Sequence, residues 1–284
     1  LPPLPKLKPY TEAPEAYRIC TGSPGLPYHT VAGLLIPFMG GVEAELIPGG
    51  GTWGCLQKMA AGEVDAAVVQ PDGPAMVDRL GHPLASVTSA LGQLHTEYLV
   101  PICHRDGLSN AADVEGSGSI AIVGGPAGGT HVTWSFFGME DRGYTETQKT
   151  FHGSLQLAAA QVASKQAQCL ISAQGLWGDT LAQVDDQYGA QLRLVDMTDM
   201  DFDDARGPAG NRLYEFATIE LSELDAADDL SAGAGGWDGE IRIPSWRALL
   251  VARTDFPETE TLNRVASAVA QARAIDFDQI ARGN

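Results

Sequence analysis

Short apolar runs and amphipathic stretches alternate along the first hundred residues. The apolar runs predict strands over residues 16–21, 42–47 and 65–70. The last of these is apolar throughout, as expected for a strand buried on both faces. Helical spacing between the runs predicts helices over about 28–38 and from a capping residue at Thr52. Such alternation of strands and helices indicates a parallel α/β sheet.

The same order returns in the second half of the chain. The pattern there predicts, in sequence, a strand over 119–123, a helix from Thr130, a strand near Thr150, a helix from Ser154, a strand over 169–172 and a helix from Gly175. Residues 196–240 are acidic and less regular. The remaining elements expected are a strand over 98–103 that leaves the first half, a late strand over 245–253 and an amphipathic helix over 259–274. The two isolated strands suit a hinge between two lobes.

Equivalent residues of the two halves are 102 positions apart. This offset places Gly22 on Gly124, Pro24 on Pro126, His29 on His131, Gly51-Thr52 on Gly153-Ser154, and Gly73 on Gly175. The identities are few, but they follow the same succession of strand, glycine turn and helix. We therefore predict an α/β protein with two similar lobes and a ligand cleft between them.

Four glycine-containing segments each precede or open a predicted helix, at residues 21–28, 50–54, 124–131 and 153–155. A helix N-terminus binds anions because its free N–H groups and its dipole both point at the ligand. In open α/β sheets ligands bind at the carboxyl ends of the strands, where these segments fall. The pattern therefore predicts a small anion held by backbone N–H groups.

Composition narrows the classes of partner. The chain has 284 residues and 44% hydrophobic content, enough for two domains, and no apolar run long enough to span a membrane. A net charge of -18 argues against nucleic acid. The start, Leu-Pro-Pro-Leu-Pro, has no apolar signal core, so we expect a mature periplasmic protein whose signal peptide has been removed.

The four cysteines lack the C-x-x-C spacing of a zinc site. An exported chain with an even number of cysteines allows one or two disulfides. Cys20 ends a predicted strand and Cys55 lies in the first turn of the following helix, which makes them a candidate pair. The alternative is four small buried apolar side chains.

Three motifs resemble the TAXI solute-binding proteins, the periplasmic receptors of one class of TRAP transporter. They are T-G-x-x-G-x-x-Y at 21–28, a Gly-Thr helix start followed by G-E-V-D-A-A within 51–67, and G-G-P-A-G-G-T at 124–130. The resemblance covers about residues 17–255. It implies a type II periplasmic-binding fold, with residues 10–102 plus 244–284 in one lobe and 103–243 in the other. It also implies a small organic anion such as glutamate as ligand, and membrane transporter subunits as partners. We expect a monomer without a cofactor, a resident metal or catalytic residues.

The expected ligand contacts lie on the glycine segments and at strand ends. They are Thr21, Ser23, Tyr28, Thr52, Trp53 and Asp72 in the first lobe, and Gly128, Gly129, Thr130, Trp134, Gln174 and Trp177 in the second. The three tryptophans have two interpretations. If they are core residues, they give no information on the ligand. If they line the cleft, they would stack on a flat acid such as pyrroloquinoline quinone.

The sequence also allows other functions for the chain and other roles for its charged residues. His29 and His131 would suit a metal-ion receptor, and a cleft Cys or His would suit an enzyme on the same fold. Arg142, Arg242 and Arg247 are candidates for clamping a carboxylate, with surface placement as the alternative. The acidic run from Asp199 to Asp204 has the spacing of a calcium loop but lacks its Gly and Glu. No nucleophile, zinc-protease or phosphate-loop motif is present.

Overall fold

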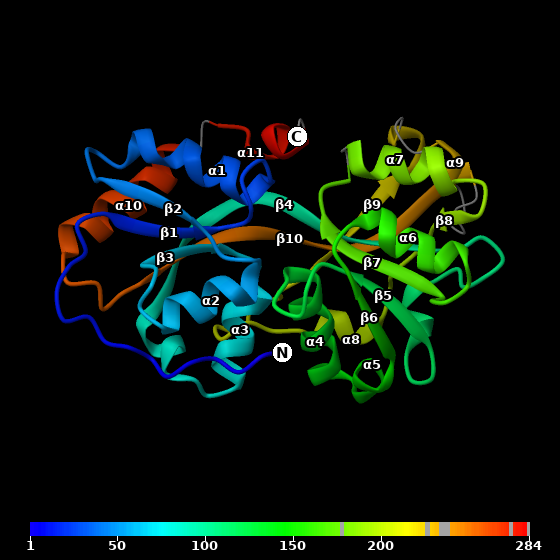
Figure 1. Ribbon diagram of the computed structural model, residues 1–284, viewed down its shortest axis with the longest axis horizontal. Helices are drawn as coiled ribbons and strands as arrows, with labels where there is room; N and C mark the ends of the chain where they lie inside the picture. The colour runs from blue at the N-terminus through cyan, green and yellow to red at the C-terminus, as the bar shows by residue number, and fades with distance from the viewer. Residues whose placement is uncertain (177–178, 225–227, 233–238, 273–274, 283–284) are drawn as a thin grey trace. The chain divides into compact units, whose positions relative to one another are not determined.

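A computed structural model describes residues 1–176, 179–224, 228–232, 239–272 and 275–282 (Figure 1). The chain forms two compact units. The first contains residues 1–96, 127–132 and 247–284, and the second contains 97–126 and 133–246. The predicted lobe boundaries fall inside β4 (Thr88–His104) and β10 (Glu240–Arg253), two long strands that each contribute residues to both units.

The sheet of the first unit is built on β1 (Tyr17–Thr21). This strand pairs in parallel with β2 (Ala44–Pro48) on one side and β3 (Ala66–Val69) on the other. β10 adds to β3 in the antiparallel direction, with Leu249 opposite Val69. All four residues of β3 are buried, as the continuous apolar run predicted. The predicted parallel α/β arrangement is confirmed here.

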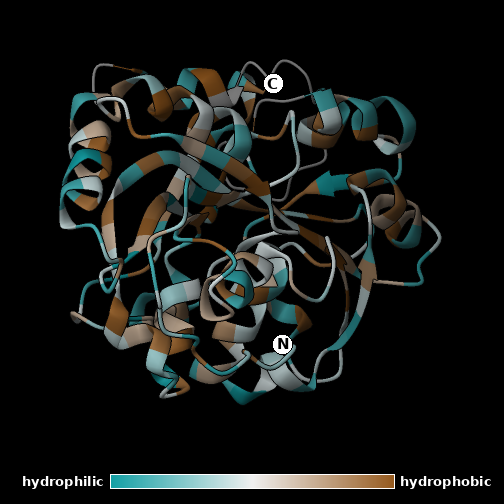
Figure 2. Cartoon of the chain, turned by 60° about the vertical axis from the view of Figure 1, so that its left-hand side comes forward, coloured by the Kyte–Doolittle hydropathy of each residue, from teal (hydrophilic) through white to brown (hydrophobic). Residues whose placement is uncertain are grey.

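Helices follow each strand of the first unit. They are α1 (Pro27–Leu35) with the 3-10 turn Ile36–Phe38, α2 (Thr52–Ala60), α3 (Asp72–Arg79) with the 3-10 turn Pro83–Val87, α10 (Thr259–Gln271) and α11 (Phe277–Arg282). Apolar side chains of α1, α10 and the strands form one core. Ile19, Val31, Val68, Leu250 and Val265 in this core are all fully buried. Figure 2 shows apolar residues concentrated along the strands and on helix segments.

The second unit repeats the parallel pattern. β5 (Ser119–Val123) pairs in parallel with β6 (Gln148–His152) and β7 (Cys169–Gln174), and β4 lies antiparallel to β7 and to β8 (Leu192–Leu194). Its other elements include the 3-10 turns Ala111–Val114 and Leu221–Glu223, α5 (Arg142–Glu146), α6 (Leu155–Ala163), α7 (Asp179–Tyr188), α8 (Met200–Asp204), β9 (Glu215–Glu220) and α9 (Asp228–Ala232). α4 (Gly129–Glu140) starts in the segment 127–132, which belongs to the first unit.

Three predicted elements differ from the structure. β4 and β10 begin earlier in the chain than the predicted 98–103 and 245–253. The sequence pattern missed their first residues because these lack a continuous apolar run. α7 begins at Asp179, whereas the internal repeat predicted a helix start at Gly175. The described part of the irregular region 196–240 contains α8, α9, the 3-10 turn Leu221–Glu223 and the strand β9, which pairs with β10. Within the described residues, no helix has the length and apolar character needed to cross a membrane.

Candidate functional site

The approach to α2 is a run of three glycines at the carboxyl end of β2. Gly50 and Gly51 have φ angles of 77° and 107°, a region that side chains disfavour. A Cβ at Gly51 would also come within 2.9 Å of the Cα of Gly128. Gly51 is the N-cap of α2 and has no side chain to cap the helix, so the first N–H groups of α2 need another acceptor.

The carbonyl oxygen of Ala127 supplies that acceptor. It accepts hydrogen bonds from the backbone N–H of Trp53 at 3.1 Å and of Gly54 at 3.3 Å. Both donors belong to the first turn of α2, and Ala127 belongs to the same unit. The glycine segment 124–130 thus places one oxygen where an anion would bind a helix N-terminus.

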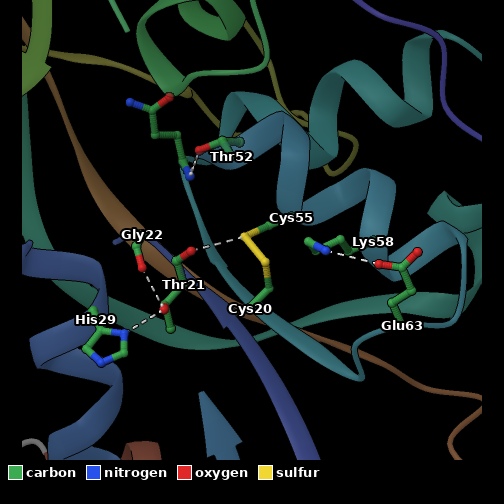
Figure 3. Close-up of a disulfide and its surroundings, with 9 residues drawn as sticks. Cys20, Thr21, Gly22, His29, Thr52, Cys55, Lys58 and Glu63 are labelled. Atoms are coloured by element: carbon green, nitrogen blue, oxygen red, sulfur yellow. Dashed lines mark hydrogen bonds and ion pairs between the residues drawn. A yellow bond between two sulfur atoms is a disulfide. The ribbon is translucent and has the colours of Figure 1, made fainter. Parts of the chain in front are cut away.

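A disulfide fixes α2 to the end of β1 (Figure 3). Cys20 precedes Thr21 in β1 and Cys55 lies in the first turn of α2, so the predicted pairing is confirmed. Gly49 lies against the bridge, because a Cβ there would overlap both sulfurs. The backbone N–H of Gly49 also donates to the carbonyl of Thr21, at 2.9 Å. The glycine run is therefore held against β1 at its first residue.

Two threonine hydroxyls of the predicted site are engaged within the first unit (Figure 3). Thr21 Oγ1 donates to the carbonyl of Gly22 at 2.9 Å and lies 3.0 Å from Nδ1 of His29. Thr52 Oγ1 accepts from the backbone N–H of Gln70 at 3.2 Å. Both threonines are buried. These hydroxyls position the ends of β1 and β3 relative to α1 and α2.

Gln70 is a candidate site residue that the sequence interpretation missed. It follows β3 directly and is only 1% exposed. Its Oε1 is buried and has no hydrogen-bond partner among the described residues. The amide lies against Gly129, where a Cβ would be 2.5–2.8 Å from Oε1, Cδ and Nε2. A buried amide without a partner is costly, so this group calls for an explanation.

Gln174 is the corresponding strand-end amide of the second unit. It ends β7, is half-buried, and its Nε2 is buried without a hydrogen-bond partner among the described residues. Asp72, its counterpart by the 102-residue offset, is fully buried at the start of α3. Both positions stay predicted ligand contacts.

The remaining polar and glycine candidates differ in exposure. Ser23 is exposed, and Tyr28 is half-buried with its ring edge-on to His95 at 5.4 Å between centroids. Gly128, Gly129 and Thr130 lie at the start of α4, with Thr130 buried. Their contact with a ligand stays a prediction.

Two of the three tryptophans predicted as ligand contacts lie within the described residues, and both pack as core residues. Trp53 and Trp134 are each 1% exposed. The indole N–H of Trp53 donates to the carbonyl of Pro2 at 2.7 Å, and that of Trp134 donates to the carbonyl of Tyr144 at 3.0 Å. Both indoles therefore have a structural role that needs no stacked ligand. Trp177 lies outside the described residues.

The bond from Trp53 belongs to a wider attachment of the N-terminal segment. Carbonyls of residues 2, 3, 5 and 8 accept hydrogen bonds from side chains of the first unit, namely Trp53, Gln57, His82 and Arg253. The proline-rich N-terminal segment is thus bound along α2 and its neighbours.

The other charged candidates make local contacts. Arg142 is exposed and pairs with Glu146. Arg242 lies over the ring of Phe216, and Arg247 pairs with Asp278. Asp199 caps α8 and accepts from the hydroxyl of Tyr144 at 2.6 Å. Among the described residues, no group of three or more His, Cys, Asp or Glu side chains could hold a metal ion.

The second disulfide joins Cys103 of β4 to Cys169, the residue directly opposite in β7. All four cysteines are therefore disulfide-bonded. The thiol needed for a cysteine nucleophile is absent from both pairs.

Comparison with known proteins identifies the fold. No family model and no curated protein matches the sequence. The chain is similar to a protein of Xanthomonas citri bound to chloride (12% identity, 94% of this chain and 87% of that chain, TM-score 0.58). It is also similar to an amino acid transporter substrate-binding protein from Streptococcus pneumoniae bound to L-arginine (8% identity, 95% and 93%, TM-score 0.51).

A third similar structure is the second VFT domain of Bordetella pertussis BvgS (13–15% identity, 94% of this chain and 91–92% of that chain, TM-score 0.50). The chain spans only 42% of the whole BvgS periplasmic domain. At such identities the likeness concerns the fold alone. The chain has the α/β fold of the two-lobed periplasmic-binding proteins, as predicted.

Proposed function

We propose that this chain is a periplasmic solute receptor that captures a small organic anion and delivers it to a membrane transporter. The observation that carries the proposal is a pair of unsatisfied amides. Gln70 directly follows β3 and Gln174 ends β7, and each has a buried polar atom without a hydrogen-bond partner among the described residues. Strand ends are where sheets of this class bind ligands, so each amide lies at a place in its own unit where a ligand group would supply the missing partner.

An anion is favoured by the local dipoles. The first turn of α2 points two N–H groups at a single oxygen, and its N-cap residue is a glycine. A carboxylate oxygen is a stronger acceptor for such groups than a neutral carbonyl. The three TAXI-like motifs support the finer assignment to a TRAP-associated receptor, since two of them build this helix start and its covering segment.

Both disulfides support an oxidising compartment and a binding role. Stable disulfides are typical of exported proteins. With Cys20, Cys55, Cys103 and Cys169 all oxidised, a catalytic thiolate is not part of the proposal. Ligand binding without chemical conversion is the function that the remaining groups suit.

The test is a thermal-shift screen of the purified full chain, followed by calorimetry. The panel contains hydroxy, keto, amino and unsubstituted carboxylic acids, L-arginine, pyrroloquinoline quinone and divalent cations after chelation. One acid should stabilise the protein by about 2.7 kcal/mol at a concentration one hundred times its Kd. Stabilisation by a cation alone would support the metal-receptor alternative, and strong quenching by the planar acid would support stacking on tryptophan.

A pair of matched variants connects binding to the site. Gln174→Met should weaken binding of the identified acid about tenfold, because a buried hydrogen bond to a charged ligand is lost. Gln183→Met, at an exposed position on α7, should change the affinity by less than about twofold. Equal effects of the two substitutions would contradict the placement of the site.

A further inference from the structure

Gln70 and the first turn of α2 converge on one short segment of chain. Ala127 O accepts from Trp53 N and Gly54 N, and the next two residues approach Gly51 and Gln70. An ideal Cβ at Gly51 would lie 3.4 Å from the N of Gly129, and one at Gly129 would lie 2.5 Å from Gln70 Oε1. A helix N-terminus and a buried unpartnered amide therefore face the same place in the first unit.

The Ala127 carbonyl is an imperfect occupant of this place. It satisfies two N–H groups of α2 but leaves Oε1 of Gln70 without a hydrogen bond among the described residues. A peptide carbonyl is neutral and presents a single acceptor oxygen to these N–H groups. A ligand with a carboxylate and an adjacent polar group would satisfy both partners at once.

We propose that Ala127 O holds the place of a ligand carboxylate oxygen, and that the Gln70 amide selects acids with a hydrogen-bonding group on the carbon next to that carboxylate. This inference rests on the proposed function. The unpartnered atom is the acceptor Oε1, so it pairs with a donor such as a hydroxyl or an amino group, and the keto acid serves as the comparison that lacks a donor. An acid with only CH₂ at that carbon leaves Gln70 unpaired in a buried site, and sites of this kind reject such analogues strongly.

The side chain of Gln70 is not needed to hold the end of β3 in place. Its backbone N–H already bonds Thr52 Oγ1, which positions the end of β3 without help from the side chain. Replacing the side chain by Met keeps the length and apolar volume and removes an unsatisfied polar group. The ligand-free variant should therefore melt no lower than the parent protein.

The experiment compares matched acids on the parent protein and on Gln70→Met by calorimetry. Each three-, four- and five-carbon series contains the unsubstituted acid and its 2-hydroxy, 2-keto and 2-amino forms. In the parent protein the best 2-substituted acid should bind at least about tenfold more tightly than its unsubstituted partner. In Gln70→Met this ratio should fall to about threefold or less.

Gln57→Met, on α2 of the same unit, is the matched control. Its amide donates to the carbonyl of Pro3 at 2.9 Å, so its loss should lower the melting temperature slightly and leave the binding ratio unchanged. Gln70→Asn, which keeps an amide but shortens its reach, should also lose the ratio. It provides a second variant if Gln70→Met fails to fold.

Nuclear magnetic resonance provides an independent measurement on the parent protein. The amide signals of Trp53 and Gly54 should shift on saturation with the tightest acid, because the acceptor of their hydrogen bonds changes. Unshifted signals would overturn the role given to Ala127 O. If acids bind but the ratio is below about threefold in the parent protein, or is the same in Gln70→Met, the selectivity of Gln70 is refuted while the receptor function stands. If no acid binds the parent protein, the proposed function itself fails, and this inference with it.

Discussion

Removal of the Cys20–Cys55 disulfide should cost the first unit about 4 kcal/mol of stability. The bridge closes a segment with a sequence separation of 35 residues. The chain-entropy relation gives about 3.8 kcal/mol at 25 °C for a loop of that length, because the oxidised unfolded chain has fewer conformations. Cys20→Ala/Cys55→Ala is the suitable variant, since both cysteines are fully buried and alanine adds no polar group there.

The second disulfide provides a matched control. Cys103–Cys169 has a sequence separation of 66 residues and lies in the other unit, so its removal should cost about 4.4 kcal/mol by the same relation. The two variants should thus lose similar stability. Only the first should also lose ligand affinity, since Cys55 fixes the first turn of α2 to the end of β1.

Urea unfolding monitored by tryptophan fluorescence and by circular dichroism measures both losses, and calorimetry with the best acid measures the affinity. Two units can unfold separately, so the probes must be compared before a single free energy is assigned. A cost below about 1 kcal/mol for the first variant would refute the loop-closure argument. Full affinity in that variant would show that α2 keeps its position without the bridge.

Three further predictions concern the first unit. Burial lowers the pKa of His95 to about 4, while the imidazole of the unfolded chain takes up a proton below about 6.5. The unfolding free energy should therefore fall as pH drops from 6.5 to 4. Urea titrations across this range should show a flatter dependence on pH for His95→Asn than for the parent protein. Asp65 is fully buried and accepts a hydrogen bond from the Arg18 guanidinium at 2.7 Å. Asp65→Ala should therefore lower the unfolding free energy by about 3 kcal/mol. A loss under about 1 kcal/mol, as small as that of an exposed ion pair, would contradict the importance of its burial. Gly49→Ala should impair formation of the neighbouring disulfide, because its Cβ would overlap both sulfurs, and a thiol count equal to that of the parent protein would contradict this.

The order of the elements in the first unit was readable from the sequence. Short apolar runs between amphipathic stretches correctly predicted β1, β2, β3 and their helices, because burial of a strand on both faces imposes a local pattern. The Cys20–Cys55 pairing followed from the same local assignment, since a strand end and the first turn of the next helix come close in a parallel sheet.

The local sequence pattern could not predict contacts between residues that are distant in the sequence. Trp53 stands beside a glycine run, which favoured a ligand contact, yet its indole is buried and bonded to the carbonyl of Pro2, 51 positions earlier in the chain. The outer halves of β4 and β10 acquire their strand geometry from pairing partners distant in sequence, and their own residues show no continuous apolar run.

Gln70 shows most clearly what tertiary structure decided. By sequence it is one of several polar residues at the end of a predicted strand, and Gln174 and then Asp72 were the candidates chosen there. Whether a buried amide has a partner depends on every chain segment that packs around it, and only the folded chain reveals that Oε1 of Gln70 is left unpaired against Gly129. Local patterns determined where the strands end; the packing of distant segments decided which of the groups there remain available to a ligand.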